Sequence, residues 1–192
     1  MTGLLASMGI VGLALSLAAK DTLTNIFAGI FIFADKPYKI GDWVVLNNGE
    51  EGKIIHIGLR STKILDRDNV EITIPNSVIG SEEVYNQTGN FNRKLRLDLA
   101  VGVSYDTDID KMEKVLLKIA EKNDEVLDEP ESKVLFRKFG ASSLDYSFLV
   151  WIKDPENQEV IIHQLYTEVI KQFRKNKIEI PYQKIDLKII KK

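Results

Sequence analysis

The side chains that usually carry catalysis or bind metal ions are few and scattered in this sequence of 192 residues. It has no cysteine, which excludes disulfides, thiolate zinc sites and cysteine nucleophiles. Its two histidines, His56 and His163, lie far apart in the sequence. Asp66 and Asp68 lack the further oxygen ligands and the glycine of a calcium loop, so they favour a hairpin turn. The residues therefore predict no catalytic site, no metal site and no cofactor.

The informative spacing lies in an uncharged segment, residues 3–19, about half of which is Gly, Ala or Ser. As a helix it would be about 26 Å long, just under the ~30 Å hydrocarbon core of a bilayer. Gly9, Leu13 and Leu17 stand four apart and form one stripe. Small residues border this stripe on both sides: Gly12 and Ser16 on one flank, Ala14 and Ala18 on the other. Such residues let helices pack closely within a membrane.

Copies of such a helix can form a ring, because each small-residue flank can meet the opposite flank of a neighbour. Leu13 and Leu17 would then face the common axis and form the apolar constriction of a narrow pore. Two alternatives are a buried helix of a soluble domain and a secretory signal peptide. The start Met1-Thr2 carries no positive side chain, and the apolar stretch is slightly long for a signal peptide. A membrane helix is therefore the preferred interpretation.

Charges at Lys20 and Asp21 interrupt the apolar stretch. From Thr22 to Ala34, apolar residues recur with the i, i+3, i+4, i+7 spacing of an amphipathic helix. This pattern predicts a bend at the charges, with the second helix lying along the membrane interface. Gly29 would weaken that helix or permit close packing. Two lysines follow at once, which indicates a cytoplasmic side.

From residue 40 the period changes to that of short strands. Alternating segments separated by tight turns such as Asn47–Glu50 and Asp66–Asn69 predict a small all-β (Sm-like) barrel over residues 40–92. The predicted strands are Gly41–Leu46, Gly52–Ile57, Leu59–Leu65 and Val70–Ile74.

Residues 93–183 predict an α+β domain with the ferredoxin-like order β-α-β-β-α-β. Thr107 is the expected cap of the first helix, and Asp154-Pro155-Glu156 opens the second. The last predicted strand of this domain is Ile178–Pro181. A closing C-terminal strand and basic tail are expected over residues 184–192.

The net charge of −2 and the pI near 5.8 argue against a globally basic nucleic-acid binder. A small barrel followed by a ferredoxin-like domain is nevertheless a combination that can bind RNA. A soluble RNA-binding module with Sm-like and ferredoxin-like domains is therefore the alternative hypothesis, although it rests on fold analogy alone.

Six segments in order resemble the small-conductance mechanosensitive channel (MscS) family, and together they span nearly the whole chain. They are Gly9–Ala19 continued by Leu23–Gly29, then Lys36–Asp42, Ile74–Asn76, Val103–Asp110, Gly140–Ser143 and Ile180–Tyr182. A single motif of this kind would be weak evidence, but six in the right order are specific.

The resemblance implies a homoheptamer with a membrane pore above a cytoplasmic vestibule, opened by membrane tension to pass ions and small solutes during osmotic downshock. Leu13 and Leu17 fall on the two leucine rings of the family's closed constriction, and the small residues beside them fall on the seams between helices. Asn25 falls on an asparagine near the β domain, and Ser77 lies in its expected partner region. Gly29 matches a glycine at a helix bend. At the main kink, Asp21, preceded by Lys20, stands where the family often has glycine.

The resemblance also implies a location in the cell membrane, with residues from about 40 onward in the cytoplasm. Membrane lipids, permeant ions and copies of the chain itself are the expected partners, and nucleic acid is not. The family has further membrane helices before the pore helix, which sense tension. We therefore expect this chain to be the truncated part of a multi-pass protein.

Overall fold

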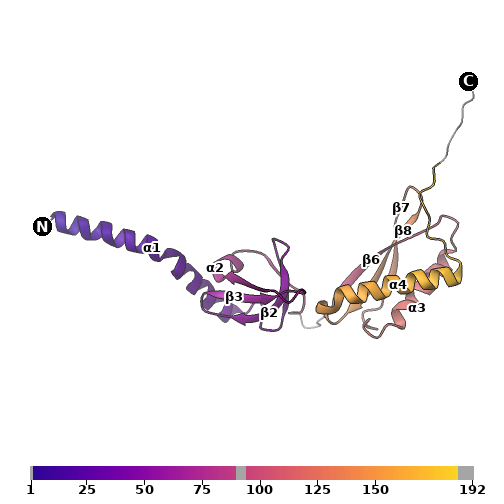
Figure 1. The fold of residues 1–192 in the computed structure, drawn as a ribbon, viewed down its shortest axis with the longest axis horizontal. Helices are drawn as coiled ribbons and strands as arrows, with labels where there is room; N and C mark the ends of the chain where they lie inside the picture. Colours follow the sequence, from indigo (N-terminus) through magenta and orange to yellow (C-terminus); the bar gives the residue numbers. More distant parts are fainter. Residues whose placement is uncertain (1, 90–93, 186–192) are drawn as a thin grey trace, which may run out of the picture. The chain divides into compact units, whose positions relative to one another are not determined.

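The computed structural model describes residues 2–89 and 94–185, and for residues 2–7 the backbone alone. The chain divides into two compact units, Met1–Asn92 and Arg93–Lys192 (Figure 1). The first unit holds a long N-terminal helix and a β domain, and the second is an α+β domain. This is the order of elements that the sequence predicts.

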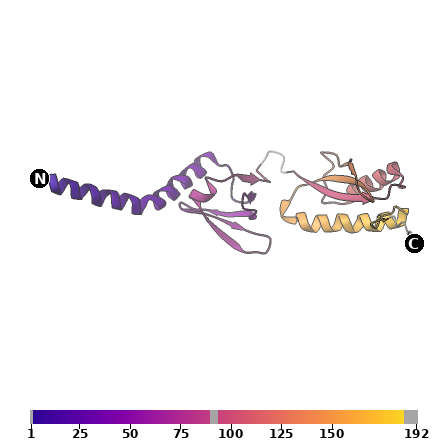
Figure 2. The same ribbon diagram turned by 90° about the horizontal axis from the view of Figure 1, so that it is seen from above.

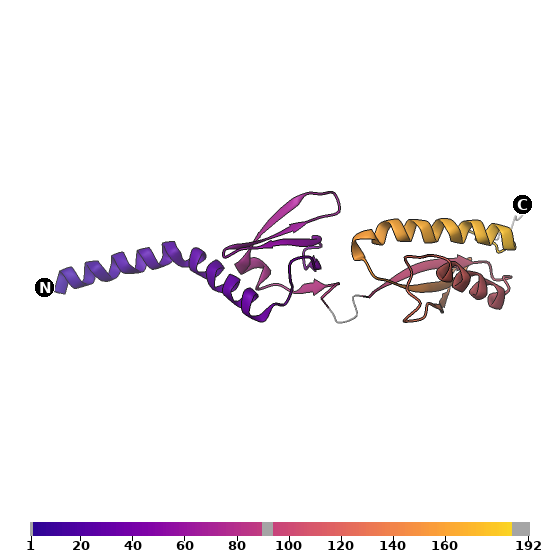
Figure 3. The same ribbon diagram turned by 90° about the horizontal axis from the view of Figure 1, so that it is seen from below.

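The N-terminal helix α1 runs without a break from Thr2 to Asp35. Lys20 and Asp21, where the sequence predicts a bend, do not interrupt the helix, because both residues lie within it. The helix does bend along its length (Figures 2 and 3). Thr24 Oγ1 donates to the carbonyl of Lys20 at 2.9 Å, and Asn25 Nδ2 donates to that of Asp21 at 2.8 Å. Side chains that bond the carbonyl four residues back are a recognised cause of helix bending.

The β domain is a five-stranded antiparallel sheet of order β4-β3-β2-β1-β5. Its strands are β1 (Trp43–Leu46), β2 (Glu51–Ile57), β3 (Ser61–Leu65), β4 (Glu71–Pro75) and β5 (Val84–Asn86), and the short helix α2 (Asn76–Ile79) connects β4 to β5. Inward-facing residues form one core, which includes Val44, Ile54 and Ile64 and also Ile32 of α1. The sequence did not predict α2 or β5, since four and three residues are too few for a repeating pattern to show.

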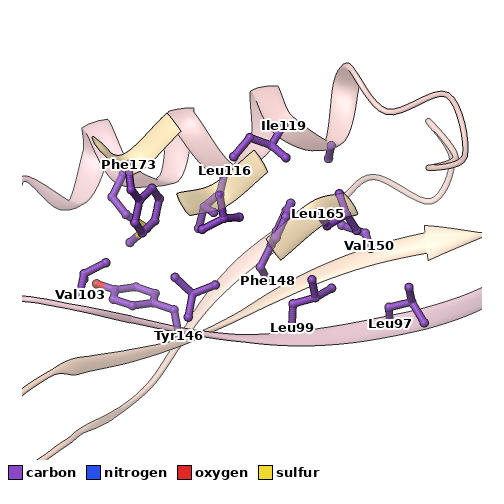
Figure 4. Close-up of a cluster of buried hydrophobic side chains, with 14 of the residues drawn as sticks. Leu97, Leu99, Val103, Leu116, Ile119, Tyr146, Phe148, Val150, Leu165 and Phe173 are labelled. Atoms are coloured by element: carbon purple, nitrogen blue, oxygen red, sulfur yellow. The ribbon is translucent and has the colours of Figure 1, made fainter. Parts of the chain in front are cut away.

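The second unit is a three-stranded antiparallel sheet of order β6-β8-β7 with its helices on one face. Its elements are β6 (Leu95–Val103), α3 (Ile109–Glu121), β7 (Lys133–Phe139), β8 (Leu144–Ile152), the 3₁₀ turn η1 (Pro155–Asn157) and α4 (Gln158–Asn176). Alternate residues of β6 and β8, such as Leu99 and Phe148, point toward Leu116 of α3 and Leu165 of α4 (Figure 4). This packing buries the apolar face of both helices.

Two details of the second unit differ from the sequence prediction. The cap of α3 is Asp108 rather than Thr107, because the helix begins at Ile109; the Asp108 carboxylate accepts from Lys111 N at 3.1 Å. The segment Ile178–Pro181 is not a strand. It forms one backbone hydrogen bond beside β6, from Ser104 N to Glu179 O, and Pro181 has no N–H to continue a ladder.

Of the predicted closing strand over 184–192, Lys184 and Ile185 are described and are not in a strand. Residues 186–192 lie outside the described part of the chain.

Leu165→Ala should lower the free energy of unfolding by about 2–5 kcal/mol, because it leaves a cavity where a fully buried side chain met the sheet. Urea denaturation followed by circular dichroism measures the loss. Val160→Ala on the same helix is the control, since Val160 is 58% exposed, and it should change stability by less than about 0.5 kcal/mol. Equal losses in the two variants would contradict the packing described above.

Candidate functional site

The first candidate site is the exposed apolar part of α1, from Met8 to Ala18. Every side chain in this segment is exposed in the single chain. Leu13 is 63% exposed and Leu17 is 65% exposed, as much as the leucine and isoleucine side chains on the other sides of the helix. A soluble domain does not leave a helix apolar and uncovered all round. This segment must therefore be covered by something other than its own chain.

The small residues beside the leucine stripe are open to the surroundings. A Cβ atom placed on Gly9 or Gly12 would have no atom within 4 Å, apart from the helix itself. Ala14, Ser16 and Ala18 on the same segment are also exposed. Both flanks thus present shallow, uncovered surfaces to which another helix could approach closely.

Among the described residues, one helix is long and apolar enough to cross a membrane, over Met8–Asp35. The span includes Lys20, Asp21 and Asp35, so its second half is less apolar than its first. Phe27, Ile30, Phe31 and Phe33 in this second half are nonetheless about half-exposed or more.

The second candidate site is the contact between the C-terminal half of α1 and the β domain. Asn25 Oδ1 accepts a hydrogen bond from the backbone N–H of Ser77 at 2.9 Å, at the start of α2. Ile32 is 5% exposed and joins the β-domain core beside Tyr38. Burial raises the pKa of the Tyr38 hydroxyl. The structure thus places Asn25 and Ser77 in direct contact, and the helix is fixed to the domain by apolar burial as well as by this hydrogen bond.

At Gly29, α1 lies directly against the β domain. A Cβ atom at this position would collide with the carbonyl oxygen of Leu59 and would lie 2.5 Å from Asn76 Nδ2. The helix continues unbroken through Gly29 to Asp35. The structure therefore shows that a side chain at position 29 would collide with the β domain. A role of Gly29 in bending the helix stays a prediction.

Asn76 is the support beneath this contact, and its importance was not evident from the sequence. Its side chain is fully buried. Its Nδ2 donates to the carbonyls of Gly58 and Leu59 at 2.9 and 3.0 Å, and its Oδ1 accepts from Thr62 Oγ1 at 3.0 Å. These bonds hold the turn between β2 and β3 in the place where α1 packs on it. Asn76 ends the segment Ile74–Asn76, one of the six that resemble the family, and this is the sequence signal that could have drawn attention to it.

The His, Asp and Glu side chains within the described residues do not cluster as metal ligands would. No group of three or more His, Asp or Glu side chains within the described residues could hold a metal ion. His56 and His163 are both exposed, in different units. Asp66 lies in the turn between β3 and β4, where its carboxylate accepts from Val70 N at 2.8 Å, as a hairpin turn requires.

Comparison with protein families gives two matches, one in each unit. Residues 21–89 match the mechanosensitive ion channel β-domain, and residues 97–180 match the C-terminal domain of mechanosensitive ion channel MscS. Among solved structures, the crystal structure of Helicobacter pylori MscS in its closed state is similar, with a TM-score of 0.87 and 27% sequence identity. That similarity covers 100% of this chain and 74% of the other.

Two channels of Methanocaldococcus jannaschii are similar in sequence. The large-conductance channel MscMJLR is 38% identical over 154 residues, which are 79% of this chain and 42% of that protein. The small-conductance channel MscMJ is 33% identical over 187 residues, which are 95% of this chain and 52% of that protein. The chain thus spans about half the length of these relatives.

Gly29→Ala should lower the free energy of unfolding by about 1–3 kcal/mol, because the new methyl group overlaps backbone that cannot move freely. Urea denaturation in detergent micelles measures the effect. Ala34→Ser, on an exposed position of the same helix, should cost less than about 0.5 kcal/mol. A Gly29→Ala protein as stable as the parent would show that the helix does not press on the β domain at this point.

Proposed function

The chain belongs to the MscS family of mechanosensitive ion channels, and we propose that it forms the pore and cytoplasmic region of a channel opened by membrane tension. The single observation that carries this proposal is the segment Met8–Ala18, an apolar helix that its own chain leaves uncovered. The RNA-binding alternative receives no support from the comparisons, in which both units match channel domains.

Exposure of this helix to water would be costly, since covering one Leu, Ile or Val side chain stabilises by about 1.5–3 kcal/mol. Lipid and neighbouring helices together can cover it on all sides. The small flanks suit the neighbours: Gly12 and Ser16 of one copy can meet Ala14 and Ala18 of the next. A contact between two different flanks repeats head to tail and closes into a ring. Seven copies is the number that the family resemblance implies.

In such a ring, Leu13 and Leu17 face the axis and form two tiers of apolar side chains. Water leaves a narrow apolar constriction, and an ion there would lose its hydration with no polar group to replace it. The closed pore therefore blocks ions by its lining. Tension favours states of larger in-plane area, so sliding of the seams widens the ring until the constriction refills with water.

The contact at Asn25, Ser77 and Gly29 connects this movement to the β domain. Because the helix is held there by a hydrogen bond and by close packing, a change in its tilt strains the contact. We place residues from about 40 onward on the cytoplasmic side of the cell membrane, and ions and small solutes are the proposed permeating species.

Leu13→Ser should give a channel that conducts without applied tension, because a hydroxyl ring keeps the constriction hydrated. The measurement is patch-clamp recording of the protein expressed from its complete gene and reconstituted in liposomes. Leu15→Ser is the matched control: Leu15 lies on the opposite side of the helix from the leucine stripe, so its closed state should remain silent. Native mass in detergent confirms assembly of both variants, with seven copies expected. A silent Leu13→Ser channel of correct mass would contradict an apolar gate.

Gly12→Leu should raise the tension needed for opening, because a large side chain on the flank obstructs the sliding of one helix past the next. The midpoint of the pressure–response curve measures this effect in the same preparation. Easier opening of this variant would argue against close packing along the seam.

A further inference from the structure

Lys20 carries a positive charge close to the proposed gate and lies within helix α1. Helix α1 continues through Lys20 to Asp35, so the direction of its side chain is set by the same helical repeat as that of the leucines. It lies three residues after Leu17, about 4.5 Å further along the helix. The charge is therefore within one turn of the second leucine tier.

The helical repeat places Lys20 on the pore side of α1. At about 100° per residue, Lys20 projects within about 40° of the mean direction of Leu13 and Leu17, and Thr24 projects along it. Asp21 projects about 60° to the other side, toward the Ala14–Ala18 flank. Lys20 and Thr24 thus continue the leucine stripe as polar residues.

The β domain does not cover this lysine. The domain packs on the side of α1 that carries Asn25, Gly29 and Ile32, about 120–180° around the helix from Lys20. The Lys20 side chain is exposed, and within the described part of the chain no carboxylate pairs with its ammonium group. The charge is free to act on whatever passes along this face.

We infer that Lys20 forms a ring of positive charge at the inner end of the pore and makes the open channel favour anions over cations. This inference rests on the proposed function, since a ring requires several copies around one axis. Charged rings are a common means of selectivity in channels. Ions in a narrow open pore pass within a Debye length of about 8–10 Å of the ring, so salt does not screen it fully.

Asp21 is the group that could cancel this effect. Its flank meets the Gly12–Ser16 flank of the next copy in the proposed ring, and Lys20 leans toward that flank. An ion pair between Asp21 of one copy and Lys20 of its neighbour would neutralise the ring. The inference therefore requires that Lys20 face the pore and not pair with Asp21 of the neighbouring copy.

Reversal potentials in a potassium chloride gradient test the inference on the tension-opened channel in excised patches. Lys20→Gln should lower the chloride-to-potassium permeability ratio by about threefold or more, as expected for loss of unit charges a few ångströms from the ion path. Lys20→Glu should reverse the preference, and Lys20→Arg should keep it. Lys36→Gln is the matched control: it removes the same charge beyond the end of α1, and the ratio should stay unchanged.

The outcomes separate the inference from the function on which it rests. A parent channel that carries no current under tension overturns both. A parent that opens under tension, with the same permeability ratio in Lys20→Gln and Lys20→Glu, overturns the charge ring alone.

Discussion

The structure depends on one constraint: the N-terminal helix is apolar all round over Met8–Ala18, and its own chain covers none of it. The two units have separate cores and do not need this segment for their packing. In the proposed channel, lipid and other copies of the chain cover it. The distribution of residue sizes decides which surface meets which partner, since large side chains suit lipid or a pore axis, and Gly9, Gly12 and Ser16 suit close helix contact.

A helix that slides against its neighbours can affect the rest of the protein only where it is firmly held. The contact around Gly29 meets this requirement, because the helix backbone there rests on the Leu59 carbonyl and the Asn76 carboxamide without an intervening side chain. Asn76 is in turn bonded to Gly58, Leu59 and Thr62. One buried side chain, in contact with the helix at Gly29, thus joins it to β3 and to the turn between β2 and β3. A fully satisfied buried polar network of this kind makes the contact rigid, whereas exposed ion pairs contribute little to stability.

The sequence predicted those features that repeat over many residues. The uncharged segment predicted the membrane helix, and the pattern over residues 93–183 predicted an α+β domain, in which β6 and β8 are the two long strands. Features set by single tertiary contacts were missed. The charges at Lys20 and Asp21 look like a break but are accommodated inside one helix, where Thr24 and Asn25 bond the local carbonyls. The roles of Leu59 and Asn76 depend on what folds against them, which no local pattern records.

The unbroken helix changes what the charged pair means for the proposed channel. In a broken chain, Lys20 and Asp21 would lie in a loop whose direction the gate does not determine. In a continuous helix, the directions of Lys20 and Asp21 around the helix axis follow from those of Leu13 and Leu17. Asn25 and Gly29 fix one side of the helix to the β domain. Rotation of the helix during opening would therefore move the leucines and the lysine together. The contact at Asn25 and Gly29 would therefore position both the proposed gate residues and the proposed ring of charge.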